Sequence, residues 1–209
     1  DAPERPCAVG YSTEGSFLLC RATTKQNRKY YWVQSPIPGV QNVGRLSISS
    51  TQGNWMMLCG RAVGVLNYSV FASQDSGRSW QEIFRGPKDY GPLNVTVSGG
   101  QPAKVLAVFF QYHPDNLLVY QSLDAGTSWQ DITGQLAEAG GEMWTGWTYK
   151  APVVFDGTGV TYFGTRNVIL QQMENGQTWK VVWENNDLIQ DMIILPGSQD
   201  FLLVSFERS

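Results

Sequence analysis

The sequence repeats one eight-residue phrase at a nearly constant interval. The pattern Ser-x-Asp-x-Gly-x-x-Trp is complete at 73–80 (SQDSGRSW) and at 122–129 (SLDAGTSW). A weaker copy, QMENGQTW, occupies 172–179, and a degenerate copy, KQNRKYYW, occupies 25–32. The tryptophans that close the four copies are therefore 48, 49 and 50 residues apart. So regular a spacing predicts one structural unit of about 49 residues, used four times.

Each unit contains short β-branched and aromatic segments separated by Gly, Pro, Asn and Asp. In the second unit these segments are 46–50, 55–60, 64–73 and 80–84, and such segments predict strands. Helical spacing is confined to 133–143, which has room for one turn. We therefore predict an all-β fold, a small β-propeller of about four four-stranded antiparallel blades, with a fifth, partial blade as the alternative.

The 209 residues are enough for a single domain with its own core. The predicted units are approximately 35–84, 85–133 and 134–187, with 1–34 and 188–209 combined in one further blade. The C-terminal segments 191–197 and 200–206 then supply the strands that the first unit lacks at its start. Joining the two ends in one blade closes the ring and removes exposed sheet edges.

The positions of the three cysteines predict one disulfide. Cys7 and Cys20 are equally far from the centre of STEG at 12–15, so a hairpin turning there places the two thiols opposite each other. Cys59 is then left as a buried thiol. The alternative is three reduced, buried cysteines. A disulfide indicates an oxidising compartment, and DAPERPC is typical of a mature chain after leader removal, so we expect a periplasmic or secreted protein.

Charge and hydropathy exclude two classes of partner. The formal net charge is −3, and the longest basic run is NRK at 27–29, which does not favour binding to nucleic acid or to an anionic membrane. No stretch approaches the roughly 20 apolar residues of a membrane span.

The repeated phrase has the chemistry of a self-contained turn. Asp75 and Asp124 can accept hydrogen bonds from backbone N–H groups of their own turn. A glycine two residues later, Gly77 or Gly126, permits a positive φ. Trp80 and its counterpart Trp129 can then pack back over the hairpin.

At these residues the sequence resembles the Asp-box, or BNR, repeat of sialidases, sortilin-type receptors and related propellers. The weaker copies keep Glu174, Gly176 and Trp179 in one case and Asn27 and Trp32 in the other. The resemblance implies a turn between the third and fourth strands of a blade, away from the ligand-binding face. It therefore implies a structural role for these residues.

Catalytic motifs of that family are not found. FRGP at 84–87 is similar to the arginine-bearing motif of sialidases, but its third residue differs and it follows the second box instead of preceding the first. The single histidine, His113, cannot form a His-rich zinc site, and no Cys-x-x-Cys is present. No nucleophile elbow or phosphate-binding loop occurs. We expect no enzyme activity, no metal and no cofactor.

The loops opposite the boxes are the expected binding surface, which we call the loop face. It comprises the connections between blades and those between second and third strands. The connection 131–150 is twice as long as its counterparts and contains Trp144, Trp147 and Tyr149, which the blade pattern does not require. These aromatics form an interface, or they plug the central channel or begin the next blade. The other candidate partner-binding residues are Arg85, Lys88, Tyr90, His113 and Arg166.

Two functions follow. The first is a non-enzymatic binding protein that presents the loop face to a protein partner, such as an inhibitor or immunity protein of a secreted hydrolase or effector. The second is glycan recognition or sialidase-like hydrolysis, in which aromatic side chains stack on sugar rings.

Overall fold

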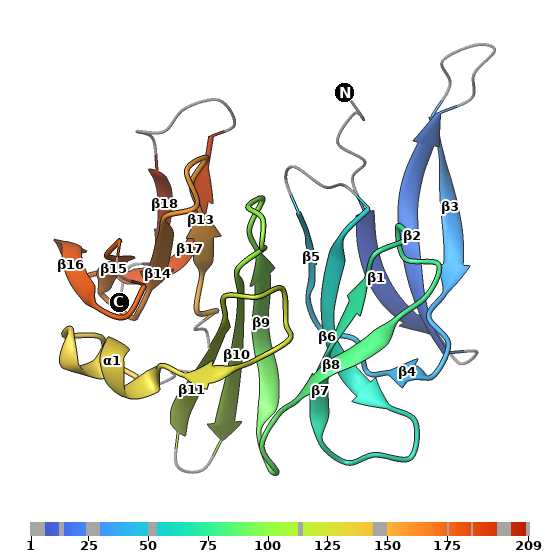
Figure 1. Cartoon of the computed structure of the whole chain (residues 1–209), viewed down its shortest axis with the longest axis horizontal. Helices are drawn as coiled ribbons and strands as arrows, with labels where there is room; N and C mark the ends of the chain where they lie inside the picture. The colour runs from blue at the N-terminus through green and yellow to red at the C-terminus, as the bar shows by residue number, and fades with distance from the viewer. Residues whose placement is uncertain are drawn as a thin grey trace.

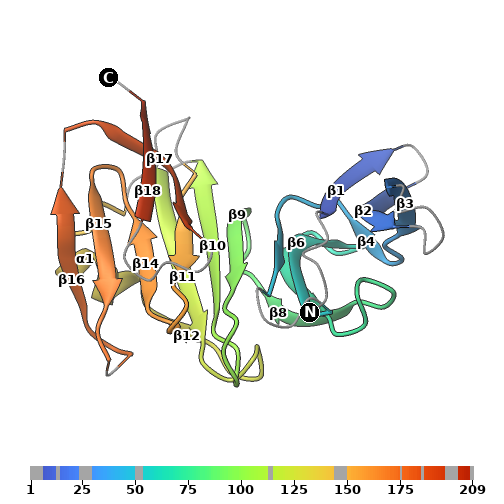
Figure 2. The same cartoon turned by 90° about the horizontal axis from the view of Figure 1, so that it is seen from above.

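The structure, a computed structural model, describes residues 7–12, 15–23, 30–49, 54–112, 115–143, 150–174, 176–184, 186–195 and 202–207. Within these residues the strands form five antiparallel sheets that follow one another along the chain (Figures 1 and 2). The prediction of an all-β fold built from four-stranded antiparallel sheets is confirmed in this coarser form.

The first two sheets comprise β1 to β8. The first contains β1 (Cys7–Ser12), β2 (Gly15–Thr23) and β3 (Tyr30–Pro36). The second contains β4 (Val40–Gln41), β5 (Leu46–Ile48), β6 (Met56–Ala62), β7 (Tyr68–Ser73) and β8 (Gln81–Arg85). Because β4 and β5 both pair with β6, they divide the innermost strand of this sheet into two pieces.

The remaining sheets comprise β9 to β18. The third contains β9 (Gly91–Val97), β10 (Val105–Tyr112), β11 (Asp115–Ser122) and β12 (Gln130–Asp131). Helix α1 (Thr133–Glu138) follows it. The fourth contains β13 (Val153–Phe155), β14 (Thr161–Gly164), β15 (Val168–Gln172) and β16 (Trp179–Glu184), and the fifth contains β17 (Leu188–Ile194) and β18 (Leu202–Glu207).

The disulfide prediction is confirmed. β1 and β2 form a hairpin whose register runs from Cys7 opposite Cys20 to Ser12 opposite Gly15. Cys7 and Cys20 are bonded, with their Cα atoms 4.2 Å apart. Cys59 is a free, buried thiol, and burial raises its pKa to about 12 because an apolar environment disfavours the thiolate.

The core lies between neighbouring sheets. One cluster joins the first and second sheets through Leu18 and Phe71, and the next joins the second and third through Val70 and Phe109. A third cluster joins the third and fourth sheets, and a smaller one joins the fourth and fifth. In β10, all residues from Val105 to Phe109 are buried, because both faces of this strand are covered. Such successive face-to-face packing is how the blades of a propeller bury their apolar surfaces.

The innermost strands are tied to one another by side-chain hydrogen bonds. Ser47 Oγ on β5 accepts the N–H of Val97 on β9 at 3.1 Å. Asn94 Nδ2 on β9 donates to the Ala151 carbonyl, just before β13, at 2.9 Å. These bonds hold the inner edges of three consecutive sheets together.

Closure of the ring is not confirmed. Among the described residues, β17 pairs with β18, whereas β1 pairs with β2 in a separate sheet. Both views place these two sheets apart, with β9 and β10 between them in Figure 1. The number of blades in a ring, the single-domain organisation and the proposed unit boundaries therefore stay predictions.

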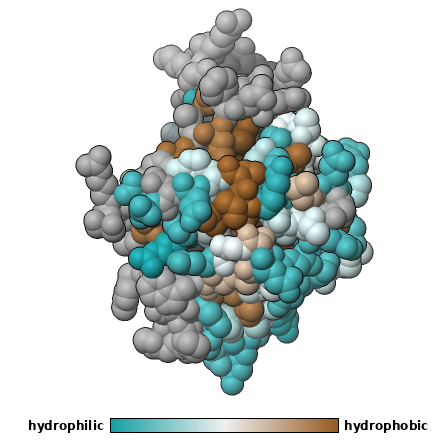
Figure 3. All heavy atoms as spheres, turned by 90° about the vertical axis from the view of Figure 1, so that its left-hand side faces the viewer, coloured by the Kyte–Doolittle hydropathy of each residue, from teal (hydrophilic) through white to brown (hydrophobic). Residues whose placement is uncertain are grey.

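The outer surface at the fourth and fifth sheets carries apolar side chains (Figure 3). The exposed large hydrophobic residues on these strands are Val181 and Val182 on β16 and Ile193 on β17. β16 is the outermost strand of its sheet, so one edge of this strand has no neighbouring strand among the described residues.

Candidate functional site

Strand direction divides the connections between two ends of the molecule. Neighbouring antiparallel strands alternate in direction. The turns between the third and fourth strands of each sheet therefore lie at one end of the molecule. The turns between the second and third strands, and the connections from one sheet to the next, lie at the other end. The turns at 73–80, 122–129 and 172–179 all join a third to a fourth strand. They therefore mark the end opposite the loop face.

The 73–80 turn uses its polar groups internally. Ser73 Oγ donates to Asp75 Oδ1 at 2.9 Å and accepts the N–H of Gly77 at 2.8 Å. Asp75 also accepts the backbone N–H of Ser79 at 2.9 Å and the hydroxyl of Ser79 at 2.7 Å. These bonds, the Ser79 hydroxyl first, lower the pKa of Asp75 to about 2, because each stabilises the carboxylate. Trp80 Nε1 donates to the Gly77 carbonyl at 3.1 Å.

The 122–129 turn reproduces this arrangement. Ser122 Oγ accepts the N–H of Gly126 at 2.7 Å, and Asp124 accepts both the backbone N–H and the hydroxyl of Ser128. The pKa of Asp124 is likewise lowered to about 2, chiefly by the Ser128 hydroxyl. Trp129 Nε1 donates to the Gly126 carbonyl at 3.0 Å. The expected turn chemistry is thus present in both complete copies.

The glycines of these turns have two reasons to lack a side chain. Gly77 and Gly126 have φ of 84° and 90°, which disfavours any residue with a Cβ. In addition, a Cβ on Gly77 would overlap Leu18 of the first sheet, and one on Gly126 would stand 2.5 Å from Ile83 of the second. Each turn therefore packs against the preceding sheet.

The weaker copies depart from this pattern. In the third, Gln172 replaces the serine and donates to the Gly176 carbonyl at 2.7 Å. Glu174 is exposed, whereas Trp179 is buried. In the fourth, Trp32 lies within β3 and is 55% exposed, whereas Trp80 and Trp129 directly precede a strand and are partly buried. Asn27 lies outside the described residues.

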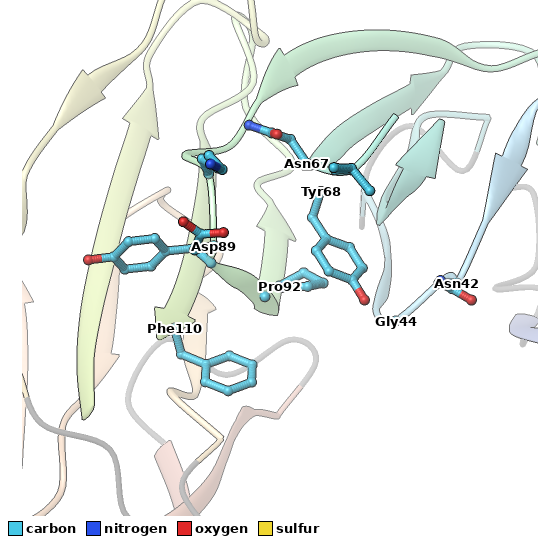
Figure 4. A pocket seen from close by; sticks show the side chains of 11 residues that line it. Asn42, Gly44, Asn67, Tyr68, Asp89, Pro92 and Phe110 are labelled. Atoms are coloured by element: carbon cyan, nitrogen blue, oxygen red, sulfur yellow. The ribbon is translucent and has the colours of Figure 1, made fainter. Parts of the chain in front are cut away.

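A pocket of about 660 Å³ opens at the loop face between the second and third sheets. Its floor is aromatic and apolar, and Figure 4 shows the rings of Tyr68 and Phe110 on either side of Pro92. Its rim is polar. The lining residues are Asn42, Gly44, Leu66, Asn67, Tyr68, Lys88, Asp89, Tyr90, Gly91, Pro92 and Phe110.

The position of Tyr68 is set by its neighbours. The Arg61 guanidinium lies 5.4 Å from the centre of the Tyr68 ring, within the range of a cation–π contact. The Tyr68 carbonyl accepts the N–H of Gly86 at 2.9 Å, and Asn67 Nδ2 donates to the Gly86 carbonyl at 3.0 Å. Gly86 in turn lies so close to the buried ring of Phe109 that a Cβ would stand 2.5 Å from it. One side of the pocket is therefore fixed to the core.

The structure brings two of the predicted partner-binding residues into this pocket, Lys88 and Tyr90. Arg85 does not line it. The sequence predicts a loop position for Arg85, but the structure places it as the last residue of β8. There its guanidinium donates two hydrogen bonds to Glu82, at 2.8 and 3.1 Å. This contact lowers the pKa of Glu82. Arg166 lies in the turn between β14 and β15, at the loop face but outside the pocket.

The other predicted residues, His113, Trp144, Trp147 and Tyr149, lie outside the described residues, and their roles stay predictions. The sequence interpretation missed Tyr68, Phe110 and Asn42. The only signal for the two aromatics is their position at the ends of predicted strands, next to the loop face. In the part of the chain that the structure describes, no group of His, Cys, Asp and Glu side chains is arranged to hold a metal ion.

No protein-family model and no curated protein matches the sequence. Solved structures do match. A mutant α-L-arabinofuranosidase, Arb93A from Fusarium graminearum in complex with an iminosugar inhibitor, aligns with a TM-score of 0.59 and 10% identity over 97% of this chain and 66% of that one. A Hadza microbial sialidase, Hz136, aligns with a TM-score of 0.51 and 13% identity over 92% of this chain and 42% of that one.

The chain thus spans less than two thirds of the length of both structures. The likeness shows the fold, which is that of the β-propellers, and at such identities it shows the fold alone. Among the described residues, no helix is long and apolar enough to cross a membrane.

Proposed function

We propose that the protein is a non-enzymatic, extracytoplasmic binding protein that holds a carbohydrate in the loop-face pocket. The observation that carries the proposal is the composition of the pocket, which combines an aromatic floor with a rim of amide and charged side chains. Its volume of about 660 Å³ lies within the usual range of ligand sites. Protein interfaces are less concave, so the shape favours a compact ligand.

The lining supplies the two kinds of contact that a sugar requires. The C–H faces of a sugar ring can pack on the rings of Tyr68 and Phe110, which offer broad apolar surfaces. Its hydroxyls both donate and accept hydrogen bonds, and Asn42, Lys88 and Asp89 at the rim supply acceptors and donors. The cation–π contact and the hydrogen bonds to Gly86 hold the Tyr68 side of the pocket in place before a ligand arrives, which reduces the entropic cost of binding.

We propose binding without hydrolysis because glycoside hydrolysis ordinarily needs two carboxyl groups flanking the scissile bond. Among the described residues that line the pocket, Asp89 is the only carboxylate. The arginine considered for a sialidase-like role, Arg85, is occupied by Glu82. The two repeated turns are proposed as Asp-box turns with a structural role, since their acidic side chains are saturated by internal hydrogen bonds.

The disulfide supports an extracytoplasmic location, periplasmic or secreted, because such bonds persist in oxidising compartments.

The test is a glycan array with the purified protein, followed by calorimetry on the ligands found. Tyr68→Ala and Lys88→Ala should each weaken binding, Tyr68→Ala by at least about tenfold. Tyr31→Ala is the matched control, because Tyr31 is an exposed tyrosine on the first sheet. An array without a bound glycan, or equal losses in Tyr68→Ala and Tyr31→Ala, would overturn the proposal. Released sugar in the same samples would overturn its non-enzymatic part.

A protein partner is the second candidate, and one observation favours it. The turn between β6 and β7 presents two large apolar side chains to solvent, Val63 at 67% and Leu66 at 80% exposure, and Leu66 also lines the pocket. Exposed apolar residues around a fixed aromatic site are typical of protein–protein interfaces. In a pulldown from the native extract, one partner should be lost with Leu66→Glu, and with Trp144→Ala and Trp147→Ala. Capture that is identical with all variants would contradict this reading.

A further inference from the structure

A second hollow lies beside the pocket, where the inner strands of four sheets approach one another. It has a volume of about 200 Å³, and its wall is mainly polar. The second, third, fourth and fifth sheets each contribute to it. The lining residues are Arg45, Leu46, Ser47, Asn94, Val95, Thr96, Lys150, Pro152, Val153 and Asp191. We call this hollow the inner site.

The pocket and the inner site share a wall. Gly44 lines the pocket and the next residue, Arg45, lines the inner site; Pro92 lines the pocket and Asn94 lines the inner site. Because these lining residues are adjacent or nearly adjacent in the chain, the two sites lie next to each other. Gly44 lies directly beside Pro92, because a Cβ added to Gly44 would stand 3.7 Å from Pro92 Cγ.

The inner site carries a local positive charge. Among its lining residues, Arg45 and Lys150 are cationic and Asp191 is anionic, which leaves one net positive charge in a chain of net charge −3. In the part of the chain that the structure describes, the ion pair found is that of Arg85 with Glu82, so Asp191 is not paired with either cation. One oxygen of Asp191 instead accepts the N–H of Met192 at 2.9 Å.

The polar wall is held in place by its own hydrogen bonds. Ser47 Oγ accepts the Val97 N–H, Asn94 Nδ2 donates to the Ala151 carbonyl, and Thr96 Oγ1 donates to the Val153 carbonyl at 3.4 Å. These groups span three sheets. The polar strands that line the site are thus tied together before a ligand binds, and the Arg45 carbonyl is itself bonded to the N–H of Cys59 at 3.0 Å.

We propose that the inner site binds the anionic group of an acidic glycan, a carboxylate or a sulfate ester, while another sugar unit of the same oligosaccharide lies in the neighbouring aromatic pocket. The Arg45 guanidinium presents a planar fork of donors that matches the oxygens of either group, and Lys150 adds a second positive charge. The inference rests on the proposed carbohydrate binding and names the class of glycan. A neutral glycan would fill only the pocket.

The test is calorimetry with three oligosaccharides of equal length, one neutral, one containing a uronic acid and one carrying a sulfate ester. The wild-type protein should bind at least one acidic ligand about tenfold more tightly than the neutral one, equivalent to about 1.4 kcal/mol. Higher salt should reduce this preference, because exposed charges are screened. The carboxylate and sulfate ligands distinguish the two possible sources of the anion.

Variants separate this inference from the proposed function. Arg45→Gln and Lys150→Gln should abolish the acidic preference while binding of the neutral ligand persists. Lys180→Gln, an exposed lysine on the outermost strand β16, is the matched control and should behave as wild type. Lys88→Gln tests Lys88, the cation among the described residues that line the pocket itself.

Each outcome decides one of the two claims. If neutral and acidic ligands bind equally, or if the preference is lost in Lys88→Gln and kept in Arg45→Gln, the inner site is not the anion site, although carbohydrate binding stands. If no oligosaccharide binds and Tyr68→Ala has no effect in any assay, the proposed function itself fails.

Discussion

Gln121 on β11 and Gln172 on β15 join neighbouring sheets through two hydrogen bonds between their amide groups, at 3.1 and 3.0 Å. Both side chains are buried. Gln172 also accepts the hydroxyl of Thr161 at 3.0 Å and donates to the Gly176 carbonyl. Its amide group is therefore fully satisfied, as a buried polar group must be to avoid a large desolvation cost.

Replacing one partner of this pair should cost more than replacing both. Gln172→Leu leaves the Gln121 amide and the Thr161 hydroxyl buried without their partner, and should lower the free energy of unfolding by about 2–3 kcal/mol. The double variant Gln121→Leu/Gln172→Leu should recover part of that loss. Urea unfolding of the wild type, the single variants Gln121→Leu and Gln172→Leu, and the double variant gives the coupling energy. Strictly additive effects would show that the two amides do not act together.

The glycines of the repeated turns should not tolerate alanine. In Gly77→Ala the new Cβ is strained by the φ of 84° and overlaps the side chain of Leu18. The variant should therefore lower the free energy of unfolding by about 2–4 kcal/mol. Gly126→Ala should behave similarly through Ile83. Gly157→Ala is the control, because a Cβ added there would have no neighbour within 4 Å, and it should change stability by less than about 0.5 kcal/mol. Thermal unfolding distinguishes these cases.

Acid should weaken the same two turns. The pKa of Asp75 and Asp124 in the folded protein is about 2, below the ordinary value of 3.8. A carboxyl group with a lowered pKa stabilises the fold above its ordinary pKa, and the contribution is lost as the pH falls through the folded value. We therefore expect stability to decline between about pH 4 and pH 2.

Unfolding midpoints measured across this pH range test the expectation. Ser79→Ala removes the hydrogen bond of one hydroxyl from Asp75 and should shift part of the decline to higher pH. Asp75→Asn/Asp124→Asn should be less stable than wild type at neutral pH and approach it near pH 2. If the double variant loses stability at low pH to the same extent as the wild type, other carboxyl groups cause the decline.

The disulfide should stabilise the first sheet. Cys7 and Cys20 are 13 residues apart, and closing a loop of this size in the unfolded chain is worth about 3 kcal/mol. Cys7→Ser/Cys20→Ser should lose approximately that amount in chemical unfolding. Reductant should lower the stability of wild type and leave the double variant unchanged. An equal response of both proteins to reductant would contradict the prediction.

Local spacing predicted the parts of the fold that are built from local interactions. Asp75 and its hydrogen-bond partners lie within four residues of each other in the sequence, so the turn could be inferred from its residues alone. The cysteine pair follows from the symmetry of one hairpin. The same reasoning fails at Trp32, because spacing alone does not fix where a strand begins. Trp80 and Trp129 immediately precede β8 and β12, whereas Trp32 lies inside β3.

The candidate site depends on how sheets stack, which no local pattern contains. Tyr68 and Phe110 belong to strands of different sheets, and in the sequence each has the character of a core residue. Arg45 and Lys150 line the same hollow only because strands from four different sheets come together there. Lys88 and Tyr90 could be predicted because they lie in the connection between β8 and β9, where neither residue is required to form a strand.

The attachment of the pocket to the core has a consequence for its behaviour on heating. Gly86 bonds to both Asn67 and Tyr68 and rests against the ring of Phe109. The wall that carries Tyr68 is thus continuous with the interior and is not a freely moving loop. Recognition should therefore survive warming until the second and third sheets separate, and it should then disappear in the same cooperative step as the fold.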